Sequence, residues 1–318
     1  MKDIAAPVAK SAILAELTPD KLLRKTNKGA NEIYVVTYHD SPNIMHEIGR
    51  LREITFREAG GGTGKDLDID QYDTQENPYK QLIVWDPDSQ EILGGYRYIL
   101  CDGLPLDENG EVKLATARLF HFSDKFMKQY MPHTLELGRS FVQPAYQSSK
   151  AGAKALFALD NLWDGLGALT VDHPEIKYFF GKVTMYTHFN VEARNMILYF
   201  FEKYFNDSEK LVYPKKPMLI DMDRDALMKT FDGGSYDADY RILTQKVREL
   251  GENVPPLINA YMNLSPSMKT FGTILNDRFG DVEETGIIVT IKDIYDAKRD
   301  RHIETYIKDK GDSFPEIK

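Results

Sequence analysis

Hydrophobic side chains near the start of the chain change from a strand-like to a helix-like spacing. Residues 32–39 carry a run rich in β-branched side chains, which favours a strand. Ser41-Pro42 then begins a segment whose apolar residues recur every three or four positions, which predicts an amphipathic helix. Its apolar positions are Ile44, Ile48, Leu51 and Phe56. The sequence therefore predicts a β-α step, preceded by an Ala-rich N-terminal arm over residues 1–30.

Two further strands are predicted at residues 80–85 and 91–101. The stretch between them, Asp86 to Gln90, has the composition of a hairpin turn. Gly94-Gly95 lies inside the second strand and indicates a bulge or the close approach of another backbone. We expect an antiparallel pair here.

The next predicted strand, Leu135 to Pro144, contains two charged side chains where a strand normally buries hydrocarbon. Glu136 and Arg139 stand three positions apart in an apolar run that stops at Pro144. A helix-patterned segment at 150–169 follows. Buried charge costs free energy unless it is paired, so these two residues mark the strand as unusual.

The second half of the chain continues with alternating strands and helices. Residues 206–262 are charged and contain proline, so we interpret them as an insertion or lid. The whole order predicts an α+β fold with a mixed, mainly antiparallel sheet flanked by helices, and with one domain over residues 31–318. The remaining elements are strands at 178–185 and 286–291 and helices at 191–204 and 240–250.

Composition limits the class of protein. The chain has 318 residues with 42% hydrophobic and 28% charged side chains, which is typical of a globular protein with a real core. A net charge of -9 argues against broad nucleic-acid binding. Its single cysteine, Cys101, excludes an intramolecular disulfide, and no apolar run reaches the ~18–20 residues of a membrane span. We expect a cytoplasmic protein, with contact to the inner face of the membrane at most peripheral.

Two stretches imitate ligand sites without meeting their requirements. Gly60 to Lys65 resembles a phosphate-binding loop, but Ala59 and Asp66 stand where that motif needs Gly and Ser or Thr. Asp66 to Asp70 resembles the start of a calcium loop but lacks the glycine at position six and the closing glutamate. We predict a flexible loop and no dedicated metal site, and a weaker cation site stays open.

Other charged residues lie at structural transitions. Arg52 falls on the first long helix, Asp70 and Asp73 follow the glycine-rich loop, and Arg97 lies inside a predicted strand. Each alone fits a surface ion pair. Together with the two charges of the 135–144 strand, they indicate a common site.

In chain order, these residues resemble a known signature. Arg52-x-x-x-Phe56, Asp70-x-x-Asp73, Gly95-Tyr96-Arg97 and Glu136-x-x-Arg139 are similar to the motifs of acyl-homoserine lactone synthases and related GNAT N-acyltransferases. The resemblance is closer to the hemolysin-like branch, which includes the ornithine lipid synthase that N-acylates an amino acid from acyl carrier protein. It spans residues 33–291 and implies a GNAT-like fold. Further matches are Leu162-Trp163-Asp164-Gly165-Leu166, Pro255-Pro256-Leu257 with Tyr261, and Asn276-Asp277-Arg278-Phe279.

One departure from the family bears on the acyl donor. The GNAT pyrophosphate loop reads Gln/Arg-x-x-Gly-x-Gly/Ala, whereas residues 149–154 keep only Gly152 of it. This makes acetyl-CoA the less favoured donor and suits a phosphopantetheine arm on an acyl carrier protein, whose acidic surface would meet Lys150, Lys154 and Lys182. A solvated helix face explains those lysines equally well.

The resemblance also implies roles for individual residues. Backbone N–H groups near Phe141 and Val142 would polarise the thioester carbonyl. Glu136 would deprotonate the incoming amine, since a carboxylate in a partly apolar strand accepts a proton readily, or it would only pair with Arg139. Arg97 or Arg52 would hold an acceptor carboxylate.

The remaining assignments concern the acceptor side and the acyl chain. Phe56, Asp70 and Asp73 would complete the acceptor site, with the two aspartates positioning its ammonium group or fixing the arginines. Five apolar residues would line an acyl tunnel or belong to an ordinary core. These five are Phe157, Trp163, Phe179, Phe180 and Met185.

We therefore predict an enzyme that transfers a long, 3-hydroxylated fatty acyl group from acyl carrier protein to an amino acid, giving an N-acyl amino acid or lyso-aminolipid. No tightly bound cofactor is expected; the co-substrate is acyl-phosphopantetheine or acyl-CoA. The alternatives are an acyl-homoserine lactone synthase, an acyl-CoA-dependent acetyltransferase, and a non-catalytic acyl-binding module on the same fold.

Overall fold

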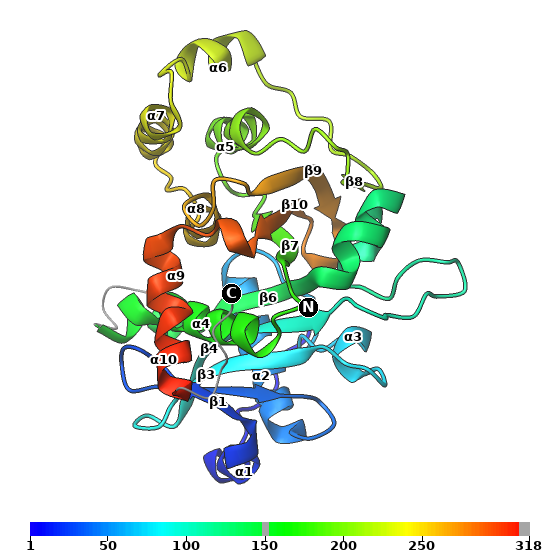
Figure 1. Cartoon of the computed structure of the whole chain (residues 1–318), viewed down its shortest axis with the longest axis vertical. Coiled ribbons are helices and arrows are strands. Elements are labelled where there is room, and N and C mark those ends of the chain that lie inside the picture. The colour runs from blue at the N-terminus through cyan, green and yellow to red at the C-terminus, as the bar shows by residue number, and fades with distance from the viewer. Residues whose placement is uncertain (148–152, 312–318) are drawn as a thin grey trace. The chain divides into compact units, whose positions relative to one another are not determined.

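The computed structural model describes residues 1–147 and 153–311, without the side chains of residues 153–156. The chain forms two compact units, coloured by position along the sequence in Figure 1. Unit 1 contains residues 1–102, 133–177 and those from 295 onward; unit 2 contains residues 103–132 and 178–294. Neither unit is continuous in sequence.

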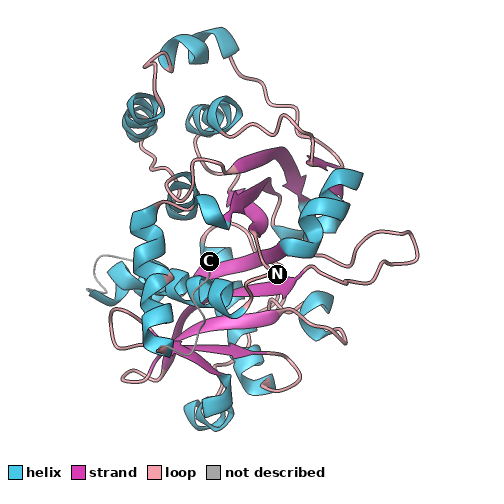
Figure 2. Ribbon diagram, in the orientation of Figure 1, coloured by secondary structure: helices cyan, strands magenta, loops and turns pink. Residues whose placement is uncertain are grey.

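Unit 1 is built on five antiparallel strands in the order β1-β2-β3-β4-β6. Figure 2 shows them side by side. The four strands predicted here are confirmed, whereas β1 falls in the segment predicted as an arm. That strand has four residues and pairs irregularly with β2, so its own sequence carries little strand signal. The strands are β1 (Leu22–Lys25), β2 (Glu32–Val36), β3 (Lys80–Asp86), β4 (Glu91–Leu100) and β6 (Thr134–Val142).

Two long helices cover opposite faces of this sheet. Helix α2 (Pro42–Glu58) reaches one face through Arg52, whose Nη2 donates to Gln81 Oε1 over 3.2 Å. Helix α4 (Ala153–Asp172) packs on the other through Gly165, where a Cβ would lie 2.7 Å from Leu82 Cδ1. Gln81 and Leu82 are consecutive strand residues, so they point to opposite faces.

The C-terminal helices of unit 1 pack against α4 and cross it (Figure 1). A Cβ at Gly167 of α4 would collide with the carbonyl of His302, so glycine is required for this approach. His302 Nδ1 lies 2.7 Å from Asp164 Oδ1. The helices and turns of unit 1 other than α2 and α4 are α1 (Lys10–Glu16), η1 (Pro19–Lys21), α3 (Gln71–Thr74), η5 (Pro144–Tyr146), α9 (Asp296–His302) and α10 (Glu304–Lys310); η4 (Met131–His133) precedes β6.

Unit 2 contains a three-stranded antiparallel sheet and a two-stranded ribbon. The sheet has the order β7-β10-β9, with β7 (Tyr178–Met185), β10 (Val282–Thr290) and β9 (Lys269–Asn276). The ribbon pairs β5 (Phe120–Phe122) with β8 (Val212–Pro214). Strand β9 was not predicted, because Gly272 adopts a φ of +81° beside a register shift and interrupts the alternation.

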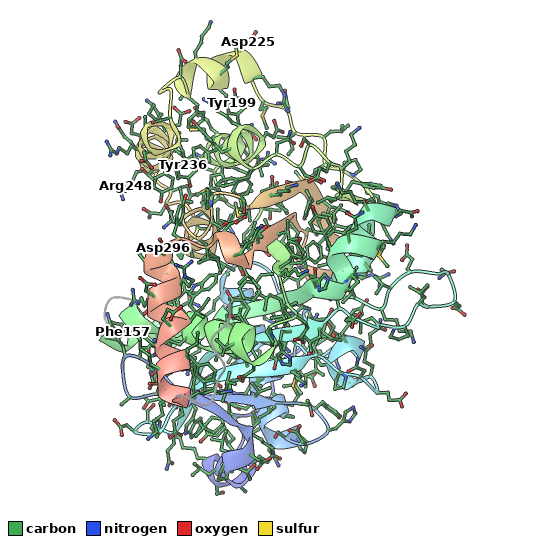
Figure 3. All side chains as sticks on the ribbon, in the orientation of Figure 1. Phe157, Tyr199, Asp225, Tyr236, Arg248 and Asp296 are labelled. Atoms are coloured by element: carbon green, nitrogen blue, oxygen red, sulfur yellow. The ribbon has the colours of Figure 1, made fainter. Side chains whose placement is uncertain are left out.

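The predicted insertion at 206–262 lies inside unit 2. Its helix α7 packs on α5, and aromatic rings fill the contact between them. Tyr236 and Tyr199, both labelled in Figure 3, belong to this group: Tyr236 lies 5.4 Å from the ring of Phe200, and Tyr199 stacks 5.8 Å from that of Phe231. The helices of unit 2 are η2 (Thr116–Arg118), η3 (Phe126–Tyr130), α5 (Val191–Tyr204), α6 (Arg224–Thr230), α7 (Tyr236–Glu249), α8 (Pro256–Met262), η7 (Asp277–Phe279) and η8 (Ile291–Asp293).

No described helix combines the length and the apolar character that crossing a bilayer requires.

Candidate functional site

The α2 face of the unit 1 sheet carries a group of charged side chains, five of them buried and two, Asp70 and Arg139, partly exposed. We call this group the charged cluster: Arg52, Asp68, Asp70, Asp73, Arg97, Glu136 and Arg139. Six of these seven residues were predicted as site residues, and the structure brings all six into unit 1.

Arg52 anchors the cluster from α2. Its side chain is 1% exposed, and Nη1 lies 3.4 Å from Asp73 Oδ2. Burial lowers the pKa of Arg52, and the negative charges of Asp73 and Asp68 work against that effect. A guanidinium does not deprotonate in proteins, so Arg52 is a permanent buried cation. Phe56, one turn further along α2, is also buried.

Arg97 projects from β4 onto the same carboxylates. Its Nη1 donates to Asp70 Oδ1 over 2.9 Å and to Asp73 Oδ2 over 3.2 Å. Burial acts to lower the pKa of Arg97, but Asp73 and Asp70 outweigh it and raise that pKa well above its usual value. Within the described residues, Arg97 Nε has no hydrogen-bond acceptor. The backbone opposite is Gly138, whose Cα carries no side chain over that N–H group.

Asp70 and Asp73 are positioned by a helix start. Asp70 is the N-cap of α3 and accepts from Tyr72 N over 3.0 Å, while Asp73 Oδ2 accepts from Asp70 N over 3.1 Å. This reciprocal capping box fixes both carboxylates relative to the backbone. Burial would raise the pKa of Asp70, but the positive charges of Arg97 and Arg139 hold it well below its usual range.

Arg139 lies at a bulge in β6. Between the pairs Gly95–Phe141 and Arg97–Gly138, β6 holds two residues where β4 holds one. Arg139 takes a φ of +49°, a left-handed conformation that a non-glycine residue adopts only when its surroundings impose it. Its Nε and Nη2 donate to the two oxygens of Asp68 over 2.7 and 3.1 Å. Asp68 is therefore a bidentate partner of Arg139, a role that one of the two sequence interpretations gives to Glu136.

Glu136 occupies the neighbouring position on the same face of β6. It is 1% exposed, and its Oε1 accepts a hydrogen bond from the Tyr79 hydroxyl over 2.9 Å. Glu136 pairs in register with Ile99 and Gly138 with Arg97, so Glu136 and Arg97 are diagonal neighbours on one face.

The carboxylates of the charged cluster accept hydrogen bonds from different kinds of donor. Asp68, Asp70 and Asp73 each accept from a guanidinium group, and Glu136 accepts from the Tyr79 hydroxyl. Glu136 therefore meets a neutral donor as well as the charged groups around it.

The glycine-rich loop binds a carboxylate of its own chain. Thr63 N and Gly64 N donate to Glu53 of α2 over 3.1 and 2.8 Å, and Arg57 pairs with the same glutamate. The loop follows a helix, as predicted, and its donors serve Glu53. In the part of the chain that the structure describes, no group of His, Cys, Asp and Glu is arranged to hold a metal ion.

The predicted donor-binding residues are only partly described. Phe141 is buried, and a Cβ at Gly94 would collide with its carbonyl, which confirms the predicted close backbone approach at Gly94. Val142 pairs with Gly94 in register. Lys150 and Gly152, and the side chain of Lys154, lie outside the described residues. Lys182 belongs to unit 2, where it is 15% exposed and pairs with buried Glu284, so it does not belong to an exposed basic face.

The five candidate tunnel residues are divided between the units. Phe157, labelled in Figure 3, lies on α4 with the Lys28 ammonium 5.4 Å from its ring centroid. Phe179, Phe180 and Met185 are buried on β7 of unit 2. Phe180 packs among the aromatic rings of that unit, which favours the ordinary-core alternative for it.

Three residues of the site were missed by sequence reasoning. Asp68 had been considered only as part of a calcium-like stretch, although its backbone N donates to Gly49 O of α2 and so fixes it under Arg139. Gln81 links Arg52 and Asp73, and Tyr79 binds Glu136. The usable signal for Gln81 was an uncharged polar residue directly before the apolar run of residues 82–85.

Comparison with known proteins identifies the family. A family model described as an acetyltransferase (GNAT) domain matches residues 51–156, which include all seven residues of the charged cluster. The glycine N(alpha)-acyltransferase of Phocaeicola vulgatus is 59% identical over 308 residues, covering 97% of this chain and 94% of that protein. That of Bacteroides thetaiotaomicron is 56% identical over 313 residues, covering 98% and 93%.

Solved structures show a weaker likeness. The aminoglycoside acetyltransferase AAC(6')-Ib with ribostamycin and coenzyme A is 12% identical, with 82% of this chain and 93% of that chain covered and a TM-score of 0.29. The same enzyme with coenzyme A and kanamycin is 11% identical, covers 85% and 96%, and has a TM-score of 0.31. Values this low bear on neither site nor ligand.

The predicted GNAT resemblance, α+β fold class and amide-forming activity are therefore confirmed, whereas the relation to the hemolysin-like branch and to acyl-homoserine lactone synthases stays a prediction. Sequence identity above 50% to both relatives, over nearly the whole length of this chain, establishes the family. The chain belongs to the family of these glycine N(alpha)-acyltransferases and is a GNAT-type N-acyltransferase.

Proposed function

We propose that this enzyme transfers a long, 3-hydroxylated fatty acyl group from acyl carrier protein to the amine of glycine. The names of the two relatives support glycine as acceptor. The observation that carries the mechanism is a buried carboxylate beside a buried guanidinium: Glu136 is 1% exposed, accepts a hydrogen bond from the Tyr79 hydroxyl, and is the diagonal neighbour of Arg97 on one face of the sheet. Such a group attracts an ammonium ion and accepts its proton.

The reaction is the aminolysis of a thioester. Glycine enters as a zwitterion, and its ammonium group loses a proton to Glu136, directly or through a water molecule. The amine nitrogen attacks the thioester carbonyl carbon, a C–N bond forms and the C–S bond breaks. The thiolate of the phosphopantetheine arm takes up a proton, so an acyl thioester and glycine give an N-acylglycine, a thiol and one proton.

Arg97 is the proposed partner of the glycine carboxylate. Its Nε has no acceptor within the described residues and faces the bare Cα of Gly138. A diagonal cross-strand pair is separated by about 7–8 Å, a span that an α-amino acid bridges when it is hydrogen-bonded at both ends. Asp73 pairs with both Arg52 and Arg97 and so fixes Arg97, and we assign buried Phe56 of α2 to the same acceptor site.

We propose that backbone N–H groups at the β6 bulge stabilise the negative charge that develops on the thioester oxygen. A bulge interrupts the regular ladder and re-aims local backbone groups. We assign the N–H groups near Phe141 and Val142 to the developing oxyanion, a role in which one donor contributes about 3 kcal/mol. Arg139, with its imposed left-handed backbone, and its partner Asp68 hold the bulge in shape.

Acyl carrier protein is the proposed donor because the 149–154 segment lacks most of the GNAT pyrophosphate-loop pattern. Lys150, Gly152 and Lys154 are the proposed contacts of the phosphopantetheine arm and its acidic carrier. The N-acylglycine product is an amphiphile, which supports peripheral contact with the inner face of the membrane during release.

Three assays test this proposal. Purified enzyme is given 3-hydroxyacyl-acyl carrier protein and each of glycine, alanine, serine, ornithine and S-adenosylmethionine, and products are identified by mass spectrometry. We expect N-acylglycine as the main product, at a kcat/KM at least 100-fold above that for the other acceptors. A lactone from S-adenosylmethionine would instead identify a homoserine lactone synthase.

The donor and the base are then tested separately. Replacing the carrier protein by the matching acyl-CoA should lower kcat/KM at least tenfold, and an equal or higher rate with acyl-CoA would overturn the donor assignment. Glu136→Gln keeps the shape of the side chain and should lower kcat by about 10²–10⁴-fold with an unchanged fold. Full activity of that variant would remove Glu136 as the base.

A further inference from the structure

Tyr79 lies immediately before β3 and contacts two members of the charged cluster, Arg97 and Glu136. Its side chain is fully buried, and its hydroxyl donates to Glu136 Oε1 over 2.9 Å. A phenol in this position supplies one strong, directed hydrogen bond to a carboxylate without adding charge.

The ring of Tyr79 is fixed on several sides. The guanidinium carbon of Arg97 lies 5.0 Å from its centroid, within the range of a cation–π contact. Tyr72 meets it edge-on at 5.9 Å. Its backbone N donates to Tyr72 O over 2.9 Å, and its carbonyl accepts from Gln81 Nε2 over 3.1 Å. The hydroxyl therefore has little freedom to move away from Glu136.

The same contacts connect Tyr79 to both ends of the proposed acceptor site. Arg97, whose Nε is assigned to the acceptor carboxylate, lies against the ring, and Glu136, assigned to the acceptor amine, accepts from the hydroxyl. One rigid side chain thus sets the position of the base relative to the carboxylate-binding arginine.

We infer that Tyr79 is a positioning residue for Glu136: its hydroxyl holds one carboxylate oxygen, fixes the orientation of the carboxylate relative to Arg97, and sets the pH at which the carboxylate becomes competent as a base. This inference rests on the proposed role of Glu136. It assigns to Tyr79 no direct contact with glycine or with the acyl group.

Tyr79→Phe tests the inference because it removes the hydroxyl and keeps the ring that packs on Arg97 and Tyr72. The carboxylate then loses a donor that favours its charged form, so the acidic limb of the kcat/KM profile should move to higher pH by about one unit. At pH 7 we expect kcat to fall about tenfold and the KM for glycine to change less than twofold.

Two further measurements separate this role from a structural one. In a double-mutant cycle, Tyr79→Phe should add less than a twofold loss to Glu136→Gln, since it acts through that carboxylate. Replacing Tyr79 with 3-fluorotyrosine makes the hydroxyl a stronger donor while it keeps the side chain full-sized, so the acidic limb should move to lower pH. The 3-fluorotyrosine variant still tests the inference if the Tyr79→Phe protein does not fold.

Tyr98→Phe is the matched control. Tyr98 is another buried tyrosine of the unit 1 sheet, but it lies on the opposite face from Glu136, so the acidic limb should stay where it is in the unchanged enzyme. An unmoved limb in both Tyr79 variants, or losses that multiply with Glu136→Gln, would overturn the inference. Full activity of Glu136→Gln would instead refute the proposed base, so the two failures are distinguishable.

Discussion

The two faces of the unit 1 sheet are both buried, yet they are built from different chemistry. Under α2, alternate residues of β3, β4 and β6 contribute Gln81, Arg97 and Glu136. Under α4, the intervening positions contribute Leu82 and a close approach to Gly165. Hydrocarbon packing tolerates repacking when volume is conserved, whereas buried ions tolerate no missing partner. The α2 face thus accepts a cost in free energy that a merely structural face would avoid.

The largest expected difference between the faces is in the loss of one ion. Asp73→Asn keeps the shape of the side chain but removes the carboxylate shared by Arg52 and Arg97. An uncompensated buried charge costs about 3–5 kcal/mol, so urea unfolding should show a loss of that size. Asp66→Asn, whose exposed partner Lys2 is 3.9 Å away, should change stability by less than about 0.5 kcal/mol. Equal losses in both variants would mean that the cluster is not energetically special.

On the α4 face, the strongest single change is overpacking. Gly165→Ala places a Cβ 2.7 Å from Leu82 Cδ1, which should cost about 1–3 kcal/mol despite the better helix propensity of alanine. Combining it with Leu82→Ala should cost less than the sum of the two single changes, because the new methyl group fills part of the cavity. We expect kcat to be unaffected by Gly165→Ala. A strictly additive double variant would argue against this contact.

Lowering the pH should reduce the contribution of the α2 face to the free energy of unfolding more than that of the α4 face. The pKa of Asp70 is lowered in the folded protein, so its contribution is fully present above the unfolded value of about 4 and is lost as pH falls below it. Asp70→Asn keeps a good N-cap but removes this charge, at a cost of about 1–2 kcal/mol at pH 7. Thermal unfolding from pH 7 down to pH 3 should show the gap between the unchanged protein and the variant closing. A difference in thermal stability that stays constant with pH would mean that the charge of Asp70 does not stabilise the folded protein.

The smallest expected change in stability is at Gly138. A Cβ there would lie 3.6 Å from Arg97 Nε, an ordinary van der Waals contact, so Gly138→Ala should alter the unfolding free energy by less than about 0.5 kcal/mol. The methyl group would nevertheless cover the N–H group assigned to the acceptor carboxylate. We expect the KM for glycine to rise about tenfold, the effect of one charge-assisted hydrogen bond. Steady-state kinetics would check this, with Gly165→Ala as the control that leaves KM unchanged.

The sequence revealed most of the elements, because strong periodicity marks them locally. The helix from Pro42, the hairpin around residue 88 and the strands at β6 and β7 are confirmed close to their predicted bounds. Strands β1 and β9 were not predicted. Strand β1 is only four residues long, and β9 is interrupted by Gly272, which has a left-handed backbone conformation. Such strands form through pairing with distant neighbours, which a local pattern does not record.

The site was predictable in its residue types but not in its pairings. A charged residue inside an apolar strand is conspicuous, so Arg97, Glu136 and Arg139 were found. Their partners depend on the β6 bulge, which sends Arg139 to Asp68. A one-residue shift in register changes which face a side chain occupies, so the bulge had to be seen before Glu136 could be assigned to Tyr79.

The discontinuity of unit 1 has a consequence for synthesis on the ribosome. All of unit 2 is made before residue 295, whereas α4 of unit 1 gains its contacts with α9 and α10 only when the last of those helices is translated. Nascent chains fold as segments emerge, so unit 2 is the first that can be completed. The contact between His302 and Gly167, which belongs to the unit that holds the charged cluster, forms only after the roughly 135 residues between them are made, and at about 5–20 residues per second this takes roughly 7–27 seconds.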